Sequence, residues 1–135
     1  MDKRLEFAIS CVLASGRIQK RYFGKRINIR HKGTIDLVTD VDMACQEEII
    51  RLIKDNFPDD DIISEEKKNY FEGDRNRWII DPLDGTTNYA HGYPFFCTSI
   101  AYEENHSVTI GVVYNPIFKE LFYAKRNEGA YLNKK

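Results

Sequence analysis

Two carboxylates follow a buried strand in this chain at a spacing that suits a metal ion. Asp81 and Asp84 stand three residues apart around Pro82, directly after the apolar run 78–80. Because proline fixes its own φ and has no N–H group, both carboxylates and the Leu83 carbonyl can face one hard cation. A ligand set made only of oxygen favours Mg²⁺, Mn²⁺ or Ca²⁺ over zinc. These residues predict an oxygen-lined metal site.

The next residues suit a phosphate. Gly85 and Thr86 begin a short predicted helix, where backbone N–H groups and the helix dipole favour an anion. A phosphate there would lie beside the metal. The alternative is an ordinary turn after a buried strand, since Asp, Pro and Gly are the usual residues of turns.

A second short apolar strand also ends in carboxylates. Residues 62–64 lead directly into Glu65 and Glu66. Two strand ends that carry acids indicate one shared cation site, with Glu65 as its third carboxylate. Glu66 either joins the site or faces solvent.

Together these motifs resemble the inositol monophosphatase family of metal-dependent, lithium-sensitive phosphatases. The family's acid pair after a small residue matches Ser64-Glu65-Glu66, and its Asp-Pro-[Ile/Leu]-Asp-Gly-Thr-x-Asn block matches 81–88. A third element, Lys-x-x-x-Asp-Leu-Val-Thr-x-x-Asp, matches 32–42. The resemblance runs through the whole of 1–135 but covers only the N-terminal half of the family fold.

The family's second half supplies a Trp-Asp motif whose aspartate is a further metal ligand, and residues that grip the substrate alcohol. This sequence holds one tryptophan, Trp78, and it precedes the first motif. We therefore expect 1–135 to be a single domain that is truncated at its C-terminal end, either a fragment or a naturally short protein.

The resemblance implies Mg²⁺-dependent hydrolysis of a small phosphorylated alcohol. The implied metal and substrate ligands come from the same motifs. They are Glu65, Asp81, Leu83 and Asp84 for the metal, and Glu65, Leu83, Asp84, Gly85 and Thr86 for the substrate phosphate.

The implied catalytic residues are Thr86, Glu65 and Asp42. Thr86 would accept a hydrogen bond from the attacking water and pass its own proton to Asp42 or Glu65. The alternative role of Thr86 is that of a hydroxyl at a helix start. The histidines have no ligand spacing and are expected in loops or on the surface; they are His31, His91 and His106.

The substrate is narrowed by the segment 87–94, Thr-Asn-Tyr-Ala-His-Gly-Tyr-Pro. It resembles the inositol monophosphatase type and not the Thr-Lys-Glu-Phe continuation of bisphosphate nucleotidases, so inositol monophosphate is favoured. Fructose-1,6-bisphosphatase and histidinol-phosphatase activities stay open. A second class of function is also open, a non-catalytic, truncated homologue that binds a metal or a phosphate or serves as an interaction module.

Composition and charge argue against other partners. A net charge of −1 gives no long-range attraction for nucleic acid, and Lys25-Arg26 and Lys67-Lys68 suit solvated surfaces. No apolar stretch approaches the roughly 18 residues of a membrane span, and the acidic N-terminus differs from a signal peptide. Cys11, Cys45 and Cys97 lie in apolar runs, as reduced core thiols do. We expect a cytoplasmic protein without nucleic-acid or membrane partners, and the resemblance adds a homodimer.

The elements that must hold the site follow from periodicity and turn residues. Expected are helices over 2–23 and from Asp40 or Asp42 to Pro58, a hairpin over 26–39, a short helix over 86–90, and strands 62–64, 77–81, 95–102, 108–114 and 120–124. Two helices followed by a meander of strands predict an α+β fold, with a helix layer on a largely antiparallel sheet. The resemblance implies the same layered α and β sandwich.

Overall fold

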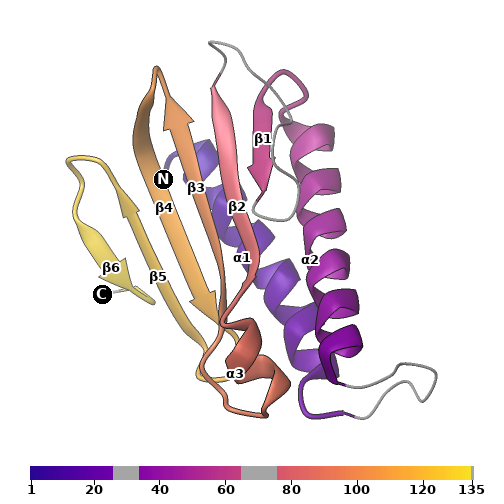
Figure 1. Ribbon diagram of the computed structural model, residues 1–135. Helices are drawn as coiled ribbons and strands as arrows, with labels where there is room; N and C mark the ends of the chain where they lie inside the picture. The colour runs from indigo at the N-terminus through magenta and orange to yellow at the C-terminus, as the bar shows by residue number, and fades with distance from the viewer. Residues whose placement is uncertain (26–33, 65–75, 135) are drawn as a thin grey trace.

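The computed structural model describes residues 1–25, 34–64 and 76–134, and the chain is shown in Figure 1. Its elements in chain order are α1 (Lys3–Tyr22), α2 (Thr34–Asn56), β1 (Asp61–Ser64), β2 (Arg77–Asp84), α3 (Thr86–Ala90), β3 (Cys97–Glu104), β4 (Ser107–Asn115), β5 (Glu120–Lys125) and β6 (Ala130–Leu132).

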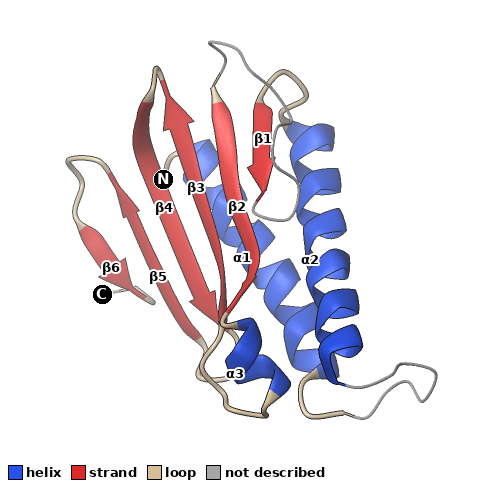
Figure 2. Ribbon diagram, viewed as in Figure 1, coloured by secondary structure: helices blue, strands red, loops and turns tan. Residues whose placement is uncertain are grey.

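The strands form one sheet in sequence order, β1-β2-β3-β4-β5-β6. Only β1 and β2 are parallel, and every other neighbouring pair is antiparallel. Both long helices lie on one side of the sheet, and α3 lies at one end of it (Figure 2). The predicted fold class, helices on a largely antiparallel sheet, is confirmed.

Helix α1 forms where the sequence predicted it. The Asp2 carboxylate accepts hydrogen bonds from the N–H groups of Arg4 and Leu5 and so caps the helix start. The helix ends before Gly24, whose φ of 74° is open to glycine at little cost. The buried stripe of α1 recurs at helical spacing and includes two polar residues: Leu5, Ala8, Val12, Ser15 and Gln19.

Helix α2 contradicts part of the prediction. It begins at Thr34, so the prediction of a second hairpin strand within 26–39 is wrong. Asp40 and Asp42 lie inside the helix and do not cap it. The first strand of that hairpin falls outside the described residues. The alternation of Ile35 and Leu37 is too short to distinguish a strand from a helix. Five buried residues at helical spacing decide for the helix: Val38, Val41, Cys45, Ile49 and Ile53.

The core has two parts, and the smaller one supports the predicted site. The larger cluster packs α1 and the later half of α2 around Trp78 on the sheet. The smaller cluster joins Val38 and Val41 of α2 to Leu83, Tyr89 and Phe96 around α3. The segment between β2 and α3 is therefore anchored by side chains from both its ends.

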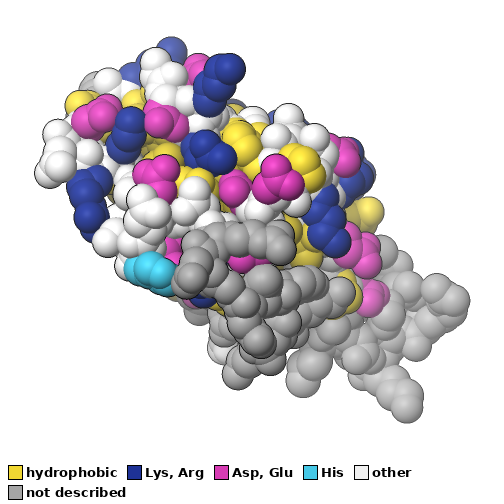
Figure 3. Space-filling model, turned by 90° about the horizontal axis from the view of Figure 1, so that it is seen from above, with side chains coloured by type: hydrophobic (Ala, Val, Ile, Leu, Met, Phe, Trp, Pro, Cys, Tyr) yellow, Lys and Arg dark blue, Asp and Glu magenta, His cyan; other side chains and the backbone are white. Residues whose placement is uncertain are grey.

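Acidic and basic side chains are interspersed over the described part of the face seen in Figure 3. No helix in the described part of the chain is long and apolar enough to cross a membrane.

Candidate metal and phosphate site

A bulge in β2 brings the two predicted metal carboxylates to the same face of the sheet. In a regular strand, residues three apart point to opposite faces. Here Asp81 pairs with Ser99, but Asp84 pairs with Cys97, so β2 carries one extra residue across this interval. Pro82 and Leu83 are both buried, whereas Asp81 is partly exposed and Asp84 is exposed. Two successive inward residues thus leave both aspartates on the outer face, away from α1 and α2.

The thiol of Cys97 reports the electrostatics of this face. Burial, together with the negative charges of Asp84 and Asp81, raises the pKa of Cys97 to about 12. Both carboxylates therefore lie near one thiol and near each other. Two such charges close together favour a cation between them.

The start of α3 needs glycine at position 85. Gly85 has a φ of 94°, and a Cβ there would lie 2.9 Å from the Phe95 carbonyl oxygen and 3.2 Å from Phe96 Cα. As the N-cap, Gly85 has no side chain to hydrogen-bond the first N–H groups of the helix. A bound anion would be held by these N–H groups, since a helix of five residues has only a small dipole.

Thr86 is the first residue of α3 and is exposed. Asp42 is buried in α2 and directly follows Val41, which belongs to the small core cluster that also holds Tyr89 of α3. The structure thus places Asp81, Leu83, Asp84, Gly85 and Thr86 in one segment, with Asp42 on the neighbouring helix. The proton transfer from Thr86 to Asp42 stays a prediction.

Glu65 and Glu66 lie outside the described residues, as do Lys32 and His31. Among the residues that are described, no group of three or more His, Cys, Asp or Glu side chains is placed to hold a metal ion. The predicted site needs Glu65 as its third carboxylate, so the described part supplies two. His91 ends α3 at the surface, where its Nδ1 lies 2.8 Å from the Thr87 carbonyl oxygen.

The sequence analysis missed a buried polar network behind the bulge. It contains Ser15 and Gln19 of α1 and Thr98 of β3, all fully buried. Gln19 and Thr98 both donate hydrogen bonds to the Pro82 carbonyl, at 2.9 and 3.0 Å. The signal was present in the sequence, because Ser15 and Gln19 continue the apolar stripe of α1 at helical spacing.

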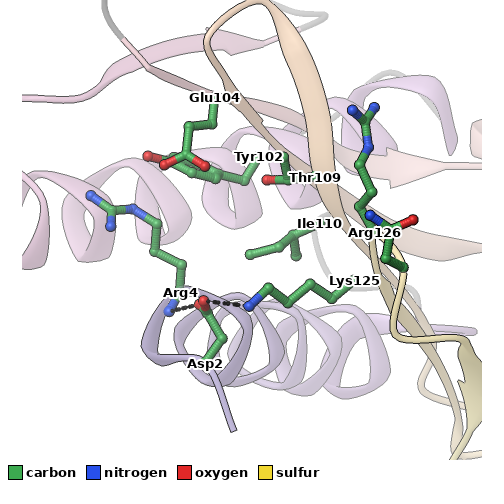
Figure 4. Close-up of a pocket in the computed structure, with 9 residues that line it drawn as sticks. Asp2, Arg4, Tyr102, Glu104, Thr109, Ile110, Lys125 and Arg126 are labelled. Carbon is green, nitrogen blue, oxygen red and sulfur yellow. Dashed lines mark hydrogen bonds and ion pairs between the residues drawn. The ribbon is translucent and has the colours of Figure 1, made fainter.

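The hollow drawn in Figure 4 is separate from this site. It has a volume of about 240 Å³ and lies at the other end of the sheet, between the start of α1 and the turns that follow β3 and β5. There Asp2 accepts hydrogen bonds from Arg4 N at 2.7 Å and Lys125 Nζ at 3.0 Å (Figure 4). These contacts tie α1 to β5.

The whole chain, residues 1–135, matches the model of the inositol monophosphatase family. The chain belongs to the inositol monophosphatase family. Inositol monophosphatase 3 of Solanum lycopersicum is 42% identical over 139 residues, which cover 100% of this chain and 52% of that protein. A fructose-1,6-bisphosphatase/inositol-1-monophosphatase of Aquifex aeolicus is 39% identical over 137 residues, covering 100% of this chain and 52% of that protein.

The fold of this inositol monophosphatase homologue agrees with solved structures of relatives. The crystal structure of the extragenic suppressor protein suhB from Bartonella henselae matches with a TM-score of 0.88 and 33% identity, over 99% of this chain and 52% of the other. The inositol monophosphatase from Anabaena matches with a TM-score of 0.82 and 36% identity, over 97% of this chain and 47% of the other. This chain spans about half the length of the relatives it matches.

Proposed function

We propose that this chain forms the metal-holding part of a Mg²⁺-dependent phosphatase that hydrolyses a small phosphorylated alcohol. The observation that carries the proposal is the bulge at Pro82 and Leu83, which turns Asp81 and Asp84 to one face of the sheet. The donor set fits a hard cation because both side chains offer only oxygen. Membership of the inositol monophosphatase family supports the reaction class.

The third carboxylate would come from Glu65. Ser64 is the last residue of β1 and pairs with Ile80 on the parallel strand β2. Glu65 directly follows Ser64, and Asp81 directly follows Ile80. The register of β1 with β2 therefore supports Glu65 as the partner of Asp81 in the proposed site. Asp81, Asp84, Glu65 and the Leu83 carbonyl would then hold Mg²⁺.

A bound Mg²⁺ would neutralise charge on the phosphoryl oxygens and lower the pKa of a water molecule. The chain's own residues would bind and orient the reactants. N–H groups from Gly85 and Thr86 would hold a phosphoryl oxygen. The Thr86 hydroxyl would accept a hydrogen bond from the attacking water and donate its own proton to Asp42 or Glu65.

For the substrate we favour inositol monophosphate. Relatives from Solanum lycopersicum and Mesembryanthemum crystallinum carry the name inositol monophosphatase at 41–43% identity. The Aquifex aeolicus relative is named for fructose-1,6-bisphosphate as well, so a sugar bisphosphate is the competing substrate. The family resemblance adds a homodimer as the proposed assembly.

Metal titration tests the proposal directly. We expect the purified chain to bind Mn²⁺ weakly, as a substitute for Mg²⁺, and Asp81→Asn to reduce the affinity at least about tenfold, since even residues that only orient a ligand are worth that much. Isothermal titration calorimetry measures both proteins. Asp59→Asn, which changes an exposed aspartate in the turn before β1, is the matched control and should bind as the original does. Equal affinity in Asp81→Asn would remove Asp81 from the site.

A non-catalytic role is the second candidate. It is the alternative for a chain that spans about half the length of the relatives it matches. On this ground we expect the chain alone to hydrolyse inositol 1-phosphate poorly. Turnover that is abolished by Glu65→Gln would show instead that these residues suffice for catalysis.

A further inference from the structure

The buried network behind the bulge ends on one atom, the Pro82 carbonyl oxygen, which lies between the two site aspartates in sequence. Gln19 Nε2 approaches this oxygen at 2.9 Å and Thr98 Oγ1 at 3.0 Å. Both side chains are fully buried, on α1 and β3 respectively. Neither residue belongs to the motifs that identify the family site.

The donor atoms of this network are set by the carbonyl oxygens that they face. Gln19 Nε2 also lies 3.2 Å from the Cys97 carbonyl oxygen, and because carbonyls only accept, the amide must present its nitrogen here. Thr98 uses its single proton on Pro82, so it accepts from Ser15 Oγ at 2.6 Å. Gln19 Nε2 has two protons, and they are shared among the Pro82 and Cys97 carbonyl oxygens and Thr98 Oγ1, the last at 2.9 Å. The network therefore has a fixed direction, from α1 toward the bulge.

The bulge itself creates the need for these donors. Pro82 and Leu83 have no opposite residue in the register of β2 with β3. A buried carbonyl without a hydrogen bond is unfavourable, so a bulge that turns Pro82 inward must find donors on the helix side. Gln19 and Thr98 provide them.

Helix α1 also holds the far end of the same segment. Tyr89 of α3 donates from its hydroxyl to the Gln19 backbone carbonyl at 2.8 Å, and both groups are buried. Residue 19 thus contacts the Pro82 end through its side chain and the α3 end through its backbone. The segment that carries Asp84, Gly85 and Thr86 lies between these two contacts.

We propose that Gln19, together with Thr98, is a positioning residue that holds Asp81 and Asp84 on one face by fixing the Pro82 carbonyl. The inference rests on the proposed metal site and deepens it. Without the two hydrogen bonds, the Pro82 carbonyl would turn toward another donor, the bulge would shift, and the two carboxylates would move apart.

Two substitutions that remove hydrogen-bond donors test the proposal in the intact chain. Gln19→Leu removes the amide, and Thr98→Val removes the hydroxyl with little change of volume. Thr98→Ser keeps the hydroxyl and is the conservative rescue. Tyr102→Phe is the matched control, because it removes a hydroxyl from an equally buried β3 residue at the other end of the sheet. The readouts are the amide chemical shifts of residues 83–86 by NMR and the Mn²⁺ affinity by calorimetry.

We expect Gln19→Leu and Thr98→Val to shift the amide signals of 83–86 and to weaken Mn²⁺ binding about tenfold, as loss of a ligand's supporting hydrogen bond does elsewhere. Thr98→Ser and Tyr102→Phe should match the original protein in both readouts. Unchanged amide signals in Thr98→Val would overturn the inference, whether or not the Mn²⁺ affinity changes. If the signals shift but the original chain binds no Mn²⁺, the metal function fails while the positioning role stands.

Discussion

At the scale of single residues, the site depends on conformations that few side chains permit. Gly85 combines a positive φ with a close approach to the backbone at Phe95 and Phe96. Pro82 and Leu83 point inward in succession, which regular strand geometry forbids and a bulge allows. These details decide where Asp81 and Asp84 point.

Gly85→Ala should therefore destabilise the chain more than an alanine at another positive-φ glycine. In Gly24→Ala the added Cβ has nothing within 4 Å, so the free energy of unfolding should fall by only about 1 kcal/mol, the cost of the left-handed conformation for alanine. Gly85→Ala also places the added Cβ 2.9 Å from the Phe95 carbonyl oxygen. Its free energy of unfolding should therefore fall by a further ~1 kcal/mol or more. Urea denaturation of the two variants measures the difference, and equal losses would show that the backbone around 85 yields easily.

The buried thiols predict a loss of stability in alkali. Burial raises the pKa of Cys45 from 9.0 to about 11, although a hydrogen bond to Ser15 opposes the shift. A raised pKa in the folded state means that the unfolded chain ionises first. The contribution of this thiol is therefore complete below pH 9.0 and is lost as the pH rises toward about 11.

We expect the free energy of unfolding to fall between pH 9.0 and about 11 by up to about 1.4 kcal/mol per pH unit for this group. Cys45→Ala should be less stable than the original protein at pH 8.5. Its free energy of unfolding should fall less steeply as the pH rises. Urea denaturation at several pH values compares the slopes. Parallel slopes in the two proteins would assign the alkaline loss to other groups.

At the scale of elements, each helix end and strand pairing positions part of the site. Helix α1 brings Gln19 beneath the bulge, α2 carries Asp42 and packs against α3, and the parallel pairing of β1 with β2 brings Ser64 next to Ile80. The start of α1 is itself fixed by Asp2. Partial burial opposes ionisation of Asp2, but hydrogen bonds from Lys125 and the N–H groups of Leu5 and Arg4 outweigh it and lower its pKa.

Asp2→Ala should destabilise the chain by about 1 kcal/mol at pH 7, because it removes the N-cap of α1. Since the pKa of Asp2 is lowered from 3.8, its contribution is present above that pH and is lost as the pH falls further. The difference between the two proteins in urea denaturation should therefore shrink toward pH 2. Asp59→Ala, at an exposed position without a cap, is the control. A difference that persists unchanged at pH 2 would contradict the role of the ionised carboxylate.

At the scale of the whole molecule, the sheet is covered unequally. Helices α1 and α2 pack on one face, while a shallow apolar groove of about 450 Å³ on β4, β5 and β6 contains Val113, Phe122 and Leu132. Strand β6 pairs only with β5 among the described strands, and all its residues are exposed. An apolar face beside an open strand edge favours association.

We expect the chain to associate with a second copy of itself through this edge. Phe122→Lys, which adds charge to the groove, should lower the average mass seen by multi-angle light scattering. Val108→Lys is the control, because Val108 is equally exposed but lies outside the groove. A monodisperse monomer at high concentration, with a cooperative thermal transition, would show that the face is stable without a partner.

The sequence alone determined what depends on local chemistry. The Asp-Pro-Leu-Asp-Gly-Thr motif, the strand before it and the short helix 86–90 were predicted because each rests on neighbouring residues, and the family resemblance followed from the same motifs. The assignment of 1–135 as one domain stays a prediction.

Only the tertiary structure decided the rest. The start of α2 was mispredicted because Val38 and Val41 are held by Leu83 and Tyr89, more than forty residues away in sequence. The role of Gln19 was invisible for the same reason, since its partner at Pro82 is 63 residues distant. Periodicity reports which face of an element is buried, whereas the atom that a buried polar group meets is fixed only when distant elements pack together.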